Sequence, residues 1–281
     1  MQPTREAKQQ IIMLKQLPPL SATATRLLEL LTNENISLEE LARVIGQDPT
    51  VAARILGVAN SAYFGQTQPI HTVEQAIIRV LGLNMVKSLA FSIAISRVFD
   101  AAKCKGFDLE AHWFRSLMTA MLSREICRRQ SGFQASDLDA VYLAGLLFDI
   151  GTLVLVYLFP DEYAGVIRQL GDTPALDPLQ LEEEVVGVNS RQAGAWLTDR
   201  WHLPPVVVQV VAQSPKEETR REVAAVSLAA DLAARREHSD RELPEVPEHL
   251  VGLTQEILAD IEVQCRLRDE ELLAIASVMA R

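Results

Sequence analysis

Cysteine, histidine and aromatic residues are all scarce in this sequence. The three cysteines, Cys104, Cys127 and Cys265, are odd in number, far apart and never in a CxxC pair. A disulfide framework and a thiolate metal site therefore have no support, and a reducing, cytoplasmic compartment is expected. The five histidines are His71, His112, His202, His238 and His249. None of them forms an HxH, HExxH or HD pair, so no contiguous metal-binding motif is present.

Positive charge is also in short supply. The chain has 27 Lys and Arg against 37 Asp and Glu, which gives a net charge of -10. This balance disfavours nucleic acid as a partner, because Lys and Arg contacts to phosphate supply most non-specific affinity. The segment 1–15 lacks the apolar core of a secretory signal. The longest apolar stretch, 141–159, is interrupted by Asp149 and Gly151, so no membrane span is expected.

The hydrophobic pattern is helical nearly throughout, and no alternating strand pattern competes with it. Capping signals divide the first hundred residues into separate helices. Ser37 with Glu40 and Thr72 with Gln75 form candidate capping boxes, and Asp48 precedes a first-turn proline. The predicted fold class is therefore all-α, a multi-helix bundle in two subdomains.

Further helices are predicted over most of the remaining chain. Their approximate ranges are 83–99, 108–130, 136–148, 152–158, 160–170, 178–186, 189–201, 217–236, 247–263 and 269–279, with another beginning at Pro204 and Pro205. The predicted domain organisation is an N-terminal helical subdomain at 1–102 and a second helical subdomain at 103–241. A linker and C-terminal helices packing on the core complete it at 242–281.

Three stretches carry a family resemblance. The first comprises LPPLSATATRLLELL at 17–31 and LEELARVIGQDPTVAARILGVANSAYFG at 38–65, and the second is HTVEQAIIRVLGLNMVKSLAF at 71–91. The third, within 113–231, includes WFRSLMTAMLSREI, LAGLLFDIGTLVL and VGVNSRQAGAWLTDRWHLPP. Together they resemble the HDOD family, bacterial output domains related to the HD metal phosphohydrolases. The resemblance implies a helical HDOD subdomain followed by a degenerate HD-like subdomain.

The resemblance also implies where metal ligands would lie. An HD centre needs neutral imidazoles and carboxylates converging on a divalent cation. The matching positions in this chain are Arg115, Phe148, Asp149, Ser190, Gln213, Ser214 and Asp231. Two carboxylates remain and every histidine is replaced, so we expect no catalytic residues, no metal and no cofactor.

Arg115 suggests what replaces the metal. A guanidinium repels a dication and neutralises a carboxylate, so we expect Arg115 to pair with Asp149, with Asp231 as a second partner. The alternative for Asp149 is a turn-capping role before Gly151. His112 is expected to be a surface or half-buried residue, since it lies outside the motif position.

Two other features allow a functional interpretation. The segment 41–56 resembles a helix-turn-helix, yet its second helix offers only Arg54 as a cation, which disfavours DNA binding. The loop at 59–65 carries Tyr63 and Phe64 as a candidate interaction surface, against the alternative that both pack onto the bundle. The arginines at 124, 128 and 129 are expected to form a solvated basic face, with binding of an anionic partner as the alternative.

The favoured function is a non-catalytic module of bacterial signal transduction that acts through protein–protein interaction. The resemblance implies signalling partners from two-component or cyclic-di-nucleotide systems. One alternative is a residual metal-dependent phosphohydrolase using Asp149 and Asp231. Another is a nucleotide or anion sensor in which Arg115 grips a phosphate within the vestigial pocket.

Overall fold

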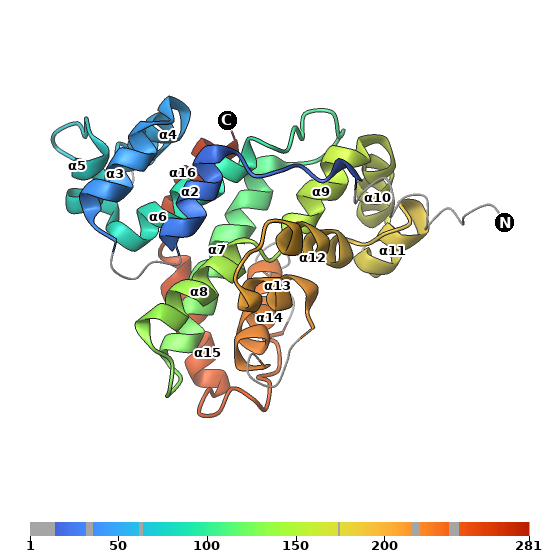
Figure 1. Cartoon of the computed structure of the whole chain (residues 1–281). Coiled ribbons are helices and arrows are strands. Elements are labelled where there is room, and N and C mark those ends of the chain that lie inside the picture. The colour runs from blue at the N-terminus through green and yellow to red at the C-terminus, as the bar shows by residue number, and fades with distance from the viewer. Residues whose placement is uncertain are drawn as a thin grey trace.

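The computed structural model describes residues 15–31, 36–61, 64–173, 175–214, 220–235 and 242–280. Within these ranges the chain forms helices joined by turns, and it contains no strand. The prediction of an all-α fold is therefore confirmed. Figure 1 shows the helices arranged around the long helix α7 (Leu109–Arg128), which runs through the centre of the molecule.

The N-terminal group of helices begins at the predicted caps, but the helix predicted over 83–99 ends at Ser96. The group consists of α2 (Ala22–Leu31), α3 (Leu38–Gly46), α4 (Pro49–Ala59), α5 (Val73–Ala76), the π-helical turn η2 (Ile77–Leu81) and α6 (Leu83–Ser96). The side chains of Ser37, Asp48 and Thr72 each accept hydrogen bonds from backbone N–H groups in the first turn of α3, α4 and α5. These bonds satisfy donors that a helix leaves unpaired at its start.

The loop after α4 is closed by one asparagine. The Asn60 side-chain amide donates to the Ile70 carbonyl at 2.8 Å, and its Oδ1 accepts from the Ile70 N–H at 2.7 Å. Phe64, inside this loop, is half-buried and packs against the core. Tyr63, the other candidate interaction residue, lies outside the described residues.

The second half of the chain surrounds α7. It contains α8 (Ala135–Leu146), α9 (Ile150–Leu158), α10 (Pro160–Asp172), α11 (Pro178–Val185), α12 (Ser190–Arg200), α13 (Pro205–Ala212), α14 (Arg220–Arg235), α15 (Gln255–Arg266) and α16 (Asp269–Ala280). Helix α7 packs against α8, α14, α15 and α16. Trp113 on α7 is fully buried, and the Trp201 indole N–H donates to the Pro18 carbonyl at 2.8 Å.

Two glycines bring α9 and α12 into backbone contact. A Cβ built at Gly151 would lie 1.8 Å from the Ser190 carbonyl oxygen, and one at Gly194 would lie 2.5 Å from a Val211 methyl group. No other residue leaves room for so close an approach. This contact places the start of α9 directly beside the start of α12.

The start of α15 differs from the prediction. A helix from residue 247 was expected, but α15 begins at Gln255, with the Thr254 hydroxyl accepting from the Ile257 N–H. Gly252 precedes this cap with φ +86°, a left-handed conformation that a helix interior excludes. Pro247 therefore lies in the turn region before α15 and not in the first turn of the helix.

The last helix joins the two ends of the chain. Helix α16 packs on α7 and also contacts α4 and α6 from the N-terminal group. Arg54 on α4 donates from Nη1 to the Met279 carbonyl at 3.1 Å and to the Ser96 hydroxyl at 3.4 Å. Because helices of all three predicted segments contact one another, the proposed domain boundaries stay a prediction.

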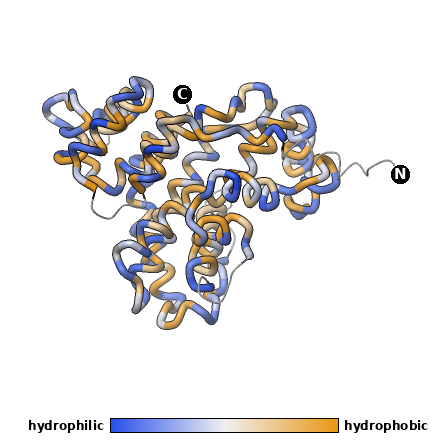
Figure 2. Tube along the Cα trace, in the orientation of Figure 1, coloured by the Kyte–Doolittle hydropathy of each residue, from blue (hydrophilic) through white to orange (hydrophobic). Residues whose placement is uncertain are grey.

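One stretch is apolar and long enough to cross a membrane by length and composition, namely Ser136–Leu158. The structure divides it at a turn, residues 147–149, and 72% of its apolar window is buried inside the protein. A core segment of a globular fold passes the same test, so this stretch is weak evidence for a span. Figure 2 shows hydrophobic and hydrophilic residues alternating along the helices, as expected when one helix face packs on a core.

Candidate functional site

A pocket of about 480 Å³ opens between α7, α9, α10, α11 and α12. Four of the seven residues at HD-like positions line it: Arg115, Phe148, Asp149 and Ser190. They come from three separate parts of the chain, and the Gly151–Ser190 contact brings two of these parts together. The pocket falls in the volume range of small-molecule sites.

The other three residues do not line this pocket. Gln213 and Ser214 follow α13, where Gln213 takes the left-handed conformation (φ 48°) that ends the helix. Asp231 is exposed on α14. Desolvation raises the pKa of Asp231, and Arg191, which does line the pocket, opposes that shift. The charge of Arg191 thus links Asp231 to the pocket.

Asp149 occupies the residue before α9. Its Oδ1 accepts a hydrogen bond from the Thr152 hydroxyl at 2.6 Å, a bond between side chains within one turn, and its side chain does not cap the backbone N–H groups of α9. Its Oδ2 lies 3.7 Å from His112 Nδ1, beyond hydrogen-bond length. Asp149 and Arg115 face the same pocket, and their ion pair stays a prediction.

His112 is fully buried behind Asp149, so the expectation of a surface or half-buried histidine was wrong. Its ring packs edge-on against Trp113 and beside Phe107. Burial lowers the pKa of His112 to about 4, with Asp149 raising it and Arg115 lowering it further. Its Nδ1 has no hydrogen-bond partner among the described residues. The imidazole is therefore neutral at neutral pH.

Glu182 and Tyr163 line the pocket and were missed by sequence reasoning. Glu182 is 3% exposed, and it accepts from the Ser190 N–H at 2.7 Å and from the Tyr163 hydroxyl at 3.1 Å. Burial raises the pKa of Glu182 to about 7, the Ser190 hydrogen bonds lower it, and Asp149 raises it. The one signal in the sequence is that Glu182 directly follows the apolar Leu181 and is the first of three consecutive glutamates.

The donor set of this pocket does not fit a divalent metal of the HD type. In the part of the chain that the structure describes, no three His, Cys, Asp or Glu side chains converge as metal ligands would. The pocket lining instead combines three carboxylates, Asp108, Asp149 and Glu182, with the guanidinium groups of Arg115 and Arg191. Fixed positive charges beside the carboxylates oppose the binding of a dication.

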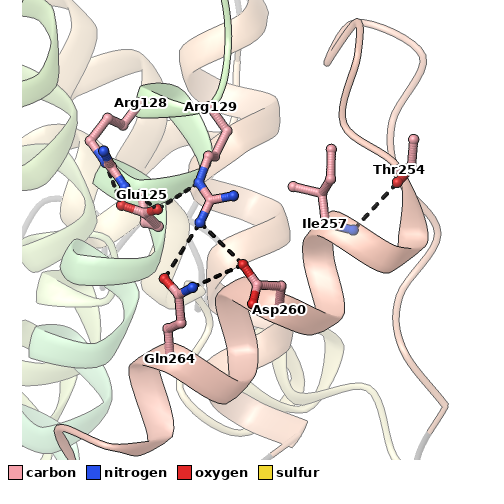
Figure 3. A network of polar contacts seen from close by, with 7 residues as sticks. All are labelled: Glu125, Arg128, Arg129, Thr254, Ile257, Asp260 and Gln264. Carbon is pink, nitrogen blue, oxygen red and sulfur yellow. Dashed lines mark hydrogen bonds and ion pairs between the residues drawn. The ribbon is translucent and has the colours of Figure 1, made fainter.

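Arg124, Arg128 and Arg129 are all exposed, as expected of a solvated face, and each also pairs with a carboxylate. Arg128 and Arg129 both donate to Glu125, and Arg129 also donates to Asp260 and Gln264 of α15 (Figure 3). Arg124 lies 3.7 Å from Asp139 on α8. This polar network fastens α15 to α7.

A family model described as HDOD domain matches residues 17–216. The match covers most of the chain, and the chain therefore belongs to the HDOD family. The pocket described above lies within residues 103–241, the part of the chain that the resemblance assigns to the HD-like half of the family.

Individual relatives are more distant. An uncharacterized protein of Treponema pallidum (strain Nichols) is 25% identical over 195 residues, which make up 69% of this chain and 37% of that protein. A protein of Marinobacter aquaeolei VT8, provisionally named for signal transduction, superposes with a TM-score of 0.84 at 24% identity, covering 98% of this chain and 66% of its own. A provisionally named phosphohydrolase of Shewanella amazonensis SB2B has a TM-score of 0.72 at 20% identity, covering 96% and 98%. This chain thus spans about a third of the first relative and two thirds of the second.

Proposed function

We propose that this chain is a non-catalytic regulatory module of bacterial signal transduction that acts by binding another protein. The observation that carries the proposal is the make-up of the pocket. Arg115, Phe148 and Ser190 occupy the positions where the HD resemblance calls for histidines, and all three line one cavity with Asp149. The signalling role rests on membership of the HDOD family, whose resemblance implies output domains.

The charge and size of the side chains support the loss of hydrolysis. Metal-assisted hydrolysis needs a cation that polarises phosphate and lowers the pKa of bound water. Phe148 offers no lone pair, and Arg115 offers only donors. His112, which lies near Asp149, is buried with its pKa lowered to about 4 by desolvation, and it does not line the pocket.

Direct DNA binding is not part of the proposal. Arg54 is the single cation of α4. It donates to the Met279 carbonyl and the Ser96 hydroxyl, so its head group faces α16 and α6. Burial lowers the pKa of Arg54, in keeping with a side chain that is half-buried.

The experiment that tests non-catalysis is a hydrolysis screen. Purified protein is incubated with nucleotides and phosphate esters, with and without Mn²⁺, and phosphate release is measured. We expect release at the level of an Asp149→Asn variant for every substrate. Metal-dependent release that disappears in Asp149→Asn would overturn the proposal in favour of the residual phosphohydrolase.

Protein binding is tested separately by quantitative cross-linking in the source cell. Because Phe64 packs on the core, Tyr63→Ser is the cleaner probe of the candidate loop. We expect a specific protein partner whose complex with this chain can be reconstituted from purified components. Loss of that complex in Tyr63→Ser would locate the binding surface at the loop 59–65. Absence of any reconstitutable protein complex would contradict the proposed mode of action.

A second candidate function is an anion or nucleotide sensor in the same pocket. The observation that favours it is the cavity of about 480 Å³ with both Arg115 and Arg191 in its lining. Guanidinium groups bind phosphate through paired hydrogen bonds. Thermal unfolding across a nucleotide panel tests it, since a ligand of the folded state raises the midpoint. A midpoint that does not move at millimolar ligand removes this candidate.

A further inference from the structure

A second pocket lies at the junction of the N-terminal, central and C-terminal helices. It measures about 390 Å³ and is lined by residues of α6, α7, α8, α15 and α16 and of the turn between the last two. None of its lining residues is shared with the Asp149 pocket. Its size is within the range of small-molecule sites.

The apolar part of this pocket is built from flexible and branched side chains. Met85 of α6, Met121 of α7, Leu138 of α8, and Leu272 and Ile275 of α16 contribute to it. Methionine adapts its shape to irregular ligands because it is unbranched and polarisable. The apolar part of a ligand could therefore be buried against these side chains.

The polar part of the lining is dominated by arginine. Arg124, Arg128 and Arg268 all line the pocket, and their side chains are 46%, 59% and 40% exposed. Glu125 is the one carboxylate among the described lining residues. A cluster of three guanidinium groups is notable in a chain with a net charge of -10.

Neighbouring carboxylates hold two of these guanidinium groups in place. Arg128 donates from Nε and Nη2 to Glu125, both at 2.7 Å, and Arg268 donates in the same way to Glu271 at 2.6 and 2.7 Å. The two bonds from Arg128 to Glu125 use Nε and Nη2 and do not involve the Nη1 group. A guanidinium fixed along one edge loses less entropy when another edge binds an anion.

The wall of the pocket depends on the network in Figure 3. Arg129 links Glu125 on α7 to Asp260 and Gln264 on α15, and Gln264 lines the pocket. The distance from Arg129 Nη2 to Asp260 Oδ2 is 3.2 Å. The network therefore holds α15, which contributes Gln264 and Cys265 to the lining, against α7.

We propose that this pocket binds a small anionic ligand with an apolar body, its acid group at Arg124 and Arg128 and its apolar part among Met85, Met121 and Leu138. A ligand held there touches the N-terminal helix α6, the central helix α7 and the C-terminal helices at once. Occupancy then stabilises the contact between the two ends of the chain. This inference does not depend on the Asp149 pocket or on the proposed function.

Titration calorimetry with defined probes tests the inference. Decanoate is compared with decan-1-ol and decylamine, which keep the chain length and change the charged group, and 8-anilinonaphthalene-1-sulfonate serves as an aromatic anion. We expect one saturable site for the two anions and affinity lower by about tenfold or more for the alcohol and the amine, since a charge-assisted bond is lost. Equal affinity for decanoate and decan-1-ol, or no binding of either anion, would overturn the proposal.

A double variant, Arg124→Gln with Arg128→Gln, locates the site. Both side chains are substantially exposed, and Glu125 keeps its bond to Arg129, so the fold is expected to persist. We expect the affinity for decanoate to fall by about tenfold or more. The control is Arg115→Gln, which changes the other pocket and should leave the affinity unchanged. If the double variant binds as tightly as the wild type while remaining folded, the assignment is wrong.

Discussion

The carboxyl group of Glu182 is buried beside the Tyr163 hydroxyl and within the influence of Asp149. Burial raises its pKa from the ordinary 4.5 to about 7. Between these values the folded protein retains a proton that the unfolded chain has released. The free energy of unfolding therefore falls as the pH rises through this window and levels off above about pH 7.

The Glu182→Gln variant lacks this titration and keeps groups that can pair with Tyr163 and Ser190. We expect wild type to lose on the order of 2–3 kcal/mol of stability relative to Glu182→Gln between about pH 4.5 and pH 8. Urea unfolding of both proteins across this range measures the difference. Glu184→Gln, an exposed neighbour, is the control. Parallel pH profiles for wild type and Glu182→Gln would contradict the account.

His112 gives a second prediction at this scale. Burial lowers its pKa to about 4, so its imidazole is expected to remain neutral at about pH 5.5, where exposed histidines are protonated. Nuclear magnetic resonance of the imidazole nitrogens, assigned with a His112→Phe variant, checks this. A titration of His112 with a midpoint near 6.5 would show that the ring is hydrated and the packing with Trp113 is wrong.

Sequence patterns recover some residues of the pocket and not others, for a physical reason. Short polar caps such as Ser37 and Thr72 act within one turn of their own helix, so local sequence predicts them. The burial of His112 and Glu182 depends on helices distant in the chain. Arg115, Phe148, Asp149 and Ser190 were found through family resemblance, and it was the fold that placed them around one cavity.

At the scale of helices, the contact between α9 and α12 requires glycine at residues 151 and 194. Gly151→Ala would drive a Cβ to within 1.8 Å of the Ser190 carbonyl oxygen, so the two helix starts would have to separate. We expect the free energy of unfolding to fall by about 3 kcal/mol or more. The clashing atom belongs to the backbone, so the clash cannot be relieved by moving a side chain. Thermal and urea unfolding measure the change.

A matched glycine in another helix serves as the control. Gly171 in α10 is exposed and has nothing within 4 Å of a built Cβ. Gly171→Ala should be neutral or stabilising by about 0.5–1 kcal/mol, because alanine favours the helix. If both alanine variants behave alike, the close approach of α9 and α12 is wrong.

Helix boundaries also show where local patterns fail. The start of α15 was predicted at Pro247, yet Thr254 provides the cap and Gly252 the left-handed turn before it. A proline is compatible with a helix start but equally with an extended turn. Thr254, whose hydroxyl accepts from the Ile257 N–H, is the stronger signal of the helix start.

At the scale of the whole molecule, α16 connects the N-terminal helices to the central helix α7. It packs on α7, α4 and α6, and Arg54 reaches its last turn. No periodicity in the sequence pairs residue 54 with residue 279, since such contacts depend on the final packing. We expect one cooperative unfolding transition, seen as coincident curves from tryptophan fluorescence and far-ultraviolet circular dichroism. Separate transitions would indicate that the N-terminal helices unfold independently.

We propose that the HD-type metal centre is lost from this chain. Calorimetric titration with Mn²⁺ tests it most directly, comparing wild type with a variant in which Arg115, Phe148 and Ser190 are all changed to histidine. Imidazoles beside Asp149 supply the missing donors. The account predicts no saturable Mn²⁺ binding by wild type and measurable binding by the folded triple variant. Stoichiometric binding by wild type that is lost in Asp149→Asn would contradict it.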